Sequence, residues 1–172
     1  MAHELYTRTN QKIFYAGLAL ESWRKAEQGQ SMNALALIQA EREAALFHLY
    51  GALLGLCHEI AGYYRLPDSA APRAERFLTA EVLEAAPSQE LGELVELAQA
   101  PDSWVAQLLS AYAELFQPPQ ASKKAKVDPS TALITAVSLD EEVAPLARET
   151  LEAWRQQLKV LAQRFRETLS EW

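Results

Sequence analysis

Four polar residues in the most apolar part of the chain have side chains that could take part in chemistry: Glu41, Arg42, His48 and Glu59. Each residue advances about 100° around a helix, so Glu41, His48 and Glu59 fall on nearly the same line of a helix covering this stretch. Arg42 lies beside that line. Two carboxylates, an imidazole and a guanidinium in one pocket could bind a small ligand or move protons.

A structural interpretation of these four residues competes with the pocket. Buried polar side chains usually have partners, and packing alone then explains them. Arg42 would pair with a carboxylate, and His48 would satisfy a neighbour's hydrogen bond. Ala52 and Gly55 are small enough to let another helix approach closely or to leave room for a ligand. We favour the structural interpretation and keep the pocket as the alternative.

The chain lacks the spacings typical of metal centres and nucleophilic enzymes. No glutamate has a histidine three positions later, which is the pattern of di-iron bundles, and His3, His48 and His58 are not one helical turn apart. There is no Gly-x-Ser-x-Gly elbow and no glycine-rich phosphate loop. Cys57 lies in an apolar stretch and is interpreted as a small buried hydrophobe. We therefore expect no metal and no cofactor, and we lean against an enzyme.

Charge and composition limit the partners and the location. The 172 residues carry a formal net charge of −7, so the surface should repel phosphate backbones and anionic lipids. We expect neither a nucleic-acid partner nor a membrane. The N-terminal residues lack an export-signal pattern, and apolar runs fall short of the roughly 20 residues of a membrane span. These observations predict a cytoplasmic protein, and they leave the oligomeric state open.

The elements that must position the four residues are helices. Apolar residues at helical spacing predict long helices over residues 3–28 and 32–65, with Gly29 as a left-handed stop and Ser31 as the next N-cap. Such a short connection predicts an antiparallel hairpin. Beyond Ala44 the second helix is apolar all round, which is typical of a central helix. A long C-terminal helix is expected over 140–170, with Pro145 in its first turn.

Prolines divide the middle of the chain into shorter elements. Helices are predicted near 73–86, 88–100 and 102–116, with Ser88 and Asp102 as caps. Residues 117–129 have the composition of a flexible linker, and 133–137 are expected to be helical or extended. The prediction is an all-α, single-domain bundle spanning residues 1–172, with about five to seven helices, a long N-terminal helical hairpin and a long C-terminal helix.

Two resemblances bear on function. The segments HELYTRTNQKIFYAGLALESWRKA and NALALIQAEREAALFHLYGALLGLCHEIAGYYRLP resemble a γ-proteobacterial, typically pseudomonad, family whose function is unknown. The resemblance is most specific over residues 3–67. It implies a bacterial cytoplasmic helical protein with no catalytic residues to carry over. Separately, the run from Arg42 to His48 resembles the Arg-x(4–6)-His motif of HEPN-type helical ribonucleases, although that motif usually lies late in its bundle.

The sequence favours a non-enzymatic interaction or regulatory protein that binds another protein through a helix face. The alternative is a small-ligand-binding or HEPN-like hydrolytic protein with a pocket at Glu41, Arg42, His48 and Glu59. Full burial of Arg42 and His48 in mutual contact would argue against the pocket.

Overall fold

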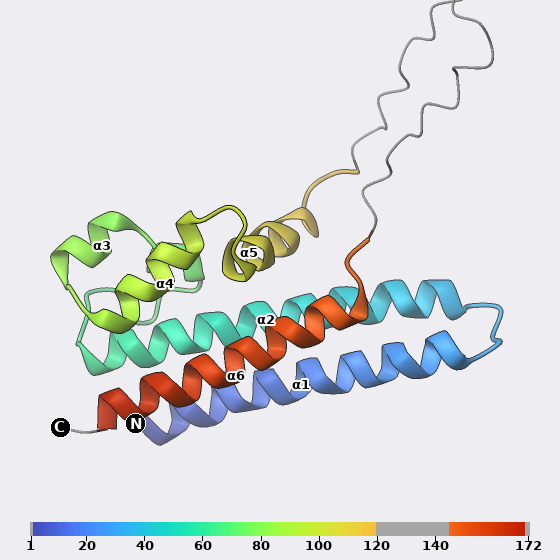
Figure 1. Cartoon of the computed structure of the whole chain (residues 1–172), viewed down its shortest axis with the longest axis horizontal. Coiled ribbons are helices and arrows are strands. Elements are labelled where there is room, and N and C mark those ends of the chain that lie inside the picture. The colour runs from blue at the N-terminus through green and yellow to red at the C-terminus, as the bar shows by residue number, and fades with distance from the viewer. Residues whose placement is uncertain (1, 120–144, 171–172) are drawn as a thin grey trace, which may run out of the picture.

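The computed structural model describes residues 2–119 and 145–170. Within these ranges it contains six α-helices and one short 3-10 helix, and it forms a single domain without strands. Helices α1 (Ala2–Gln28) and α2 (Ala34–Tyr63) form the predicted antiparallel hairpin, and α6 (Arg148–Ser170) lies along both (Figure 1). The predicted all-α bundle is therefore confirmed.

The three long helices form a triangular prism with three faces. Arg148 of α6 bonds to Glu27 near the end of α1, and Arg166 bonds to Asn10 near its start, so α6 runs antiparallel to α1. Helices α4 (Gln89–Gln99) and α5 (Trp104–Glu114) pack on α2 and cover the face between α2 and α6 (Figure 1). The α1–α2 face and the α1–α6 face remain uncovered by the described residues.

Helix α2 is the central helix, as its apolar circumference predicts. From Ala45 to Ala61 most of its side chains are buried in the core. By length and composition α2 is the one described helix that could cross a membrane, but 67% of its most apolar stretch is buried within the protein. Burial by neighbouring helices explains this apolar character without a membrane.

The α1–α2 seam is close because small residues of α2 meet α1. A Cβ on Gly55 would lie 2.6 Å from the hydroxyl oxygen of Thr9, which is fully buried. Further along, a Cβ on Gly62 would lie 3.3 Å from Leu5. The sequence analysis left the space beside Gly55 open to another helix or to a ligand. In the structure α1 fills this space.

Both ends of the hairpin turn differ from the prediction. Gly29 is not a left-handed stop: no glycine has a positive φ, and the Gly29 N–H continues helical bonding to Lys25 and Ala26. Ser31 is not the N-cap either. Its hydroxyl donates to the Asn33 side chain and accepts from the Asn33 N–H over 3.4 Å, so it serves the turn before α2. Helix α2 begins at Ala34, after Asn33, without a side-chain cap.

The left-handed conformation that was predicted at Gly29 occurs instead at Arg65, at the end of α2. Arg65 has a φ of 52°, the Leu66 N–H donates to Ala61 over 2.9 Å, and the Arg65 N–H donates to Gly62 over 3.4 Å. This pair of bonds is a Schellman motif, and the buried Leu66 supplies its apolar contact. An arginine thus occupies a position that favours glycine.

The shorter helices are confirmed with shifted boundaries. The stretch 73–86 contains a 3-10 turn, Ala74–Arg76, and a separate helix α3, Ala80–Ala85, because the Thr79 hydroxyl accepts from the Val82 N–H and starts a new helix. Ser88 caps α4 as predicted, whereas α5 is capped by Ser103 and not by Asp102.

Helix α6 begins later than predicted. Residues 145–147 are not helical, so Pro145 precedes the first turn, and the Leu146 carbonyl accepts from Arg42 of α2. The expected start at 140, most of the 117–129 linker and the 133–137 run lie outside the described residues.

Candidate functional site

The structure places the four predicted site residues in different surroundings along α2. At about 1.5 Å per residue, Glu41 and Glu59 lie about 27 Å apart along the helix axis. The contacts of each side chain decide what it can do.

Arg42 connects three elements and takes a structural role. Its guanidinium stacks over Trp23 of α1, 4.8 Å from the ring centroid. Its Nε donates to the Leu146 carbonyl over 3.2 Å, and its Nη1 donates to Gln39. Cation–π stacking and a bond to a carbonyl hold the side chain in one direction. Arg42 thus holds Leu146, which lies just before α6, against the α1–α2 hairpin.

Glu59 belongs to a buried ion pair. Its side chain is fully buried, and Arg166 donates to its two oxygens over 2.9 and 2.8 Å. Arg166 also donates to Asn10 over 2.9 Å and lies 4.7 Å from the ring of Tyr6. A two-pronged pair of this kind fixes geometry as well as charge. Glu59 therefore ties α2, α6 and α1 together, and its carboxylate is buried away from solvent.

Glu41 lines a shallow cavity of about 360 Å³ where α1 ends and α2 begins. Lys25, Ser22 and Leu37 share this cavity with it. None of the other three predicted residues lines it, so this cavity does not assemble the predicted pocket.

His48 is the predicted residue that remains near the surface among groups capable of recognition. It is half-buried on the α1–α2 face. Its ring meets Tyr15 edge-on at 5.4 Å and Phe47 at 5.3 Å between centroids. The ammonium of Lys12 lies 5.3 Å from the Phe47 ring and 6.0 Å from the Tyr15 ring. We call Lys12, Tyr15, Phe47 and His48 the aromatic cluster.

The surroundings of His48 disfavour the charged form of its ring. Burial, and secondarily the nearby Lys12 ammonium, lower the pKa of His48 below its usual value. Its buried Nδ1 has no hydrogen-bond partner within the described residues. The neutral ring can therefore donate or accept one further hydrogen bond, depending on its tautomer.

Gly51 and the exposed rings give the aromatic cluster its shape. A Cβ on Gly51 would lie 3.2 Å from the Lys12 side chain, so the missing Cβ lets the lysine stem lie flat across α2. Phe47 is 50% exposed and Tyr15 is 39% exposed. The result is two half-exposed rings around one ammonium, on a surface fixed by two packed helices.

The arrangement does not favour catalysis. Arg42 and His48, the two residues of the ribonuclease-like run, contact different partners and do not converge. Within residues 2–119 and 145–170 no group of three His, Cys, Asp or Glu side chains is arranged to hold a metal ion. Cys57 is fully buried, and burial raises its pKa to about 12, which makes it a weak nucleophile.

Sequence reasoning missed Lys12, Tyr15 and Phe47 because their importance depends on the register of the hairpin. Gly51 faces Lys12 and Gly55 faces Thr9 in the structure. Aligning the small residues of α2 against α1 would have brought Tyr15 beside His48. Helical periodicity within one helix carries no such pairing information.

Comparison with known proteins adds a family and no activity. No curated protein and no solved structure matches the chain. One family model, described as a family of unknown function (DUF6586), matches residues 1–172. Because this match covers the whole chain, the protein belongs to the DUF6586 family.

Proposed function

We propose that this chain is a non-enzymatic helical interaction protein that binds a partner protein through the aromatic cluster. The observation that carries the proposal is the pair of half-exposed rings, Tyr15 and Phe47, held around the Lys12 ammonium. The proposal keeps the expected setting, the cytoplasm of a γ-proteobacterium, on the strength of the resemblance over residues 3–67.

The rigidity of the α1–α2 seam supports a binding role. Aromatic residues on fixed elements are enriched in the energetic centres of protein interfaces. A surface that is already ordered loses little conformational freedom on binding. Phe47 and Tyr15 offer apolar area, while Lys12 offers a positive charge beside it. A partner that presents an apolar side chain next to a carboxylate would match these groups.

The hydrolytic alternative has less support. It needs Arg42 and His48 to act on one phosphate, but Arg42 is committed to Trp23 and Leu146. The net charge of −7 also opposes an RNA substrate.

Photo-crosslinking in cells of the source organism tests the proposal. A benzophenone amino acid replaces Phe47 in one version and Val160 in a control version, because Val160 is 57% exposed on the outer side of α6. We expect a discrete adduct to a different protein from position 47 only, identified by mass spectrometry. Adding Lys12→Glu should remove most of it.

Two outcomes would overturn the proposal. One is the same adduct pattern from positions 47 and 160. The other is an adduct at position 47 that contains only a second copy of this chain.

A further inference from the structure

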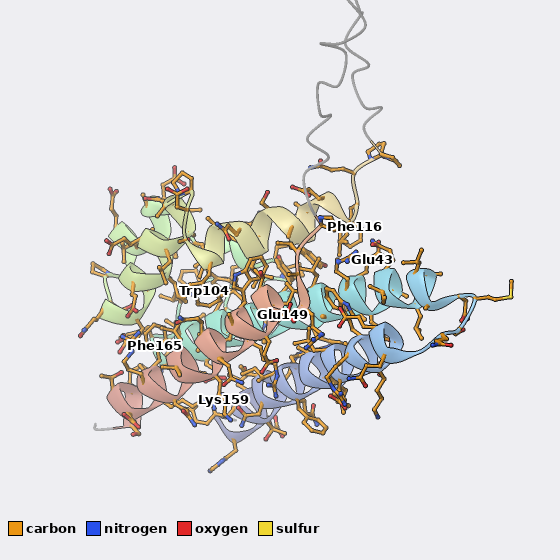
Figure 2. The ribbon with its side chains drawn as sticks, turned by 45° about the vertical axis from the view of Figure 1, so that its right-hand side comes forward. Glu43, Trp104, Phe116, Glu149, Lys159 and Phe165 are labelled. Carbon is orange, nitrogen blue, oxygen red and sulfur yellow. The ribbon has the colours of Figure 1, made fainter. Side chains whose placement is uncertain are left out.

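A cavity of about 310 Å³ lies between α1 and α6, and the described residues that line it include no carboxylate. Three cations line this cavity, Arg155, Lys159 and Arg166, together with the side-chain amides of Asn10 and Gln163. Figure 2 shows Lys159 on the part of α6 that runs beside α1. In a chain with a net charge of −7, this cavity is a local concentration of positive groups. We call it the cationic cavity.

The carboxylates that pair with two of these cations do not line the cationic cavity. Arg155 donates to Glu152 over 3.1 Å, but Glu152 lines an adjoining cavity of about 380 Å³. Arg166 donates to both oxygens of Glu59, whose side chain is fully buried. These pairs hold the two guanidinium groups in place and offset part of their charge. Lys159 is exposed and makes no ion pair within the described residues, so its ammonium is the unbalanced charge of the cavity.

Arg155 is fixed across α1 and keeps one donor unused. A Cβ on Gly17 would lie 2.7 Å from its Nη2, so the glycine leaves room for the guanidinium. Its Nε donates to the Ile13 carbonyl over 2.9 Å, whereas its Nη2 makes no hydrogen bond within the described residues. A guanidinium held in one orientation suits a carboxylate, because its N–H groups are planar and already directed.

Exposed rings connect the cationic cavity to the aromatic cluster. Phe14 lines the cavity and is 59% exposed. Its ring centroid lies 6.4 Å from that of Tyr15, and the Tyr15 ring meets His48 at 5.4 Å. The aromatic surface therefore continues around α1, from the aromatic cluster on one side to the cationic cavity on the other. One segment of a partner that crosses α1 contacts both.

Charge complementarity favours an acidic occupant of the cationic cavity. A carboxylate next to an apolar side chain matches Lys159 beside Phe14, as it matches Lys12 beside Phe47 in the aromatic cluster. The net charge of −7 opposes an extended polyanion such as a nucleic acid. A short acidic segment is different, because it meets the local cations within the range over which salt leaves charges unscreened.

We propose that the cationic cavity binds an acidic segment of the same partner protein that contacts the aromatic cluster. The segment crosses α1 with its apolar side chains on Phe14 and Tyr15, and its carboxylates accept hydrogen bonds from Lys159 and Arg155. This inference rests on the proposed function, since it extends that contact across α1. It gives the partner a chemistry: acidic and apolar side chains in one segment.

Titration of the purified full chain tests the chemistry of the occupant without the partner. The probe is a short synthetic peptide of glutamates and leucines, and NMR on isotope-labelled protein follows its binding. We expect the backbone amide signals of Asn10 and Gln163 to shift. The same peptide with glutamine in place of glutamate should leave these signals unmoved. Lys159→Glu should raise the Kd of the glutamate peptide about 10-fold, because an attraction becomes a repulsion at the same position.

Arg164→Glu is the matched control for Lys159→Glu. It changes the net charge by the same amount on the same helix, but Arg164 pairs with Glu93 of α4 and does not line the cationic cavity. Salt screens position 164 from the cavity, so the Kd should stay within about 2-fold of the wild-type value. Both positions are exposed, and circular dichroism checks that both variants are folded. A wild type that binds the glutamate peptide no better than the glutamine peptide would overturn the inference, as would equal effects of the two variants.

Photo-crosslinking in cells connects the cationic cavity to the partner. A benzophenone amino acid in place of Phe14 should capture the same protein as at position 47, through a peptide that carries aspartates or glutamates. Adding Lys159→Glu should remove this adduct, and adding Arg164→Glu should not. An adduct at position 47 without one at position 14 overturns this inference and leaves the proposed function standing. The absence of a discrete adduct at position 47 overturns the proposed function and this inference with it.

Discussion

Helix α1 meets its two long neighbours through seams of opposite character. Against α2 the contact is close, since Gly55 lets the buried Thr9 approach. Against α6 the contact is bridged by long polar side chains, and Arg155 fills the space above Gly17. Each seam contains a glycine that makes room for a neighbour. Gly55 lets the α1 backbone approach, whereas Gly17 leaves space for the charged side chain of Arg155. The same residue type therefore produces rigid packing on one face and an open groove on another.

The largest effect should come from the buried ion pair that fastens α6 to the hairpin. Glu59→Ala leaves Arg166 without its carboxylate and should lower the free energy of unfolding by about 3–5 kcal/mol. Urea unfolding measures the loss. The exposed pair Arg164–Glu93 is the control, and Arg164→Ala should cost no more than about 1 kcal/mol.

Replacing the whole Glu59–Arg166 pair separates charge from shape. Glu59→Met combined with Arg166→Leu should be much less damaging than Glu59→Ala, because no buried charge is left unpaired. If the double variant is as unstable as the single one, α6 depends on the detailed geometry of the pair.

The two glycines provide a matched test of the two seams. Gly55→Ala forces a methyl group against Thr9 and should destabilise the fold by about 1–3 kcal/mol. Gly17→Ala gains about 1 kcal/mol of helix propensity. It loses the Arg155 bond to Ile13, worth about 1 kcal/mol, and should therefore be nearly neutral in thermal unfolding. Equal losses at both positions would show that the α1–α6 seam is as closely packed as the α1–α2 seam.

The smallest effect should be the acid sensitivity of His48 at the edge of the close seam. Its folded-state pKa lies below the unfolded value of about 6.5, so the folded protein binds fewer protons. The stability it contributes is complete above about pH 6.5 and is lost as the pH falls through the folded-state pKa. The free energy of unfolding, measured as a function of pH, should no longer show this acid-dependent loss in His48→Gln.

An NMR titration follows His48 directly. Lys12→Met removes the nearby ammonium and should raise the pKa of His48 toward its usual value, while burial still keeps it low. An unchanged pKa would mean that Lys12 does not act on the ring.

Much of the helical framework could be predicted from the sequence, because apolar periodicity is strong in the long helices. The ends were harder, since Gly29 and Arg65 exchanged their expected conformations and Ser31 bonded to Asn33 instead of capping α2. Those outcomes depend on local bonds that propensity does not specify. The partner of Glu59 was equally hidden, because Arg166 is 107 positions away in the chain.

The candidate site was predictable only in part. Four polar residues on α2 were identified, but their partners come from α1 and α6, and a single-helix projection does not contain them. His48 stays a candidate because Lys12 and Tyr15 lie beside it.

The position of α6 in the chain has a consequence for the order of folding. Its bonds to the hairpin join residues 107 to 156 positions apart, as in Arg166 with Glu59 and Arg166 with Asn10. Contacts that close long loops form slowly, whereas a helical hairpin forms from near neighbours. We expect α1 and α2 to pair early and α6 to dock late. Substitutions in the Glu59–Arg166 pair should then accelerate unfolding and leave the refolding rate almost unchanged.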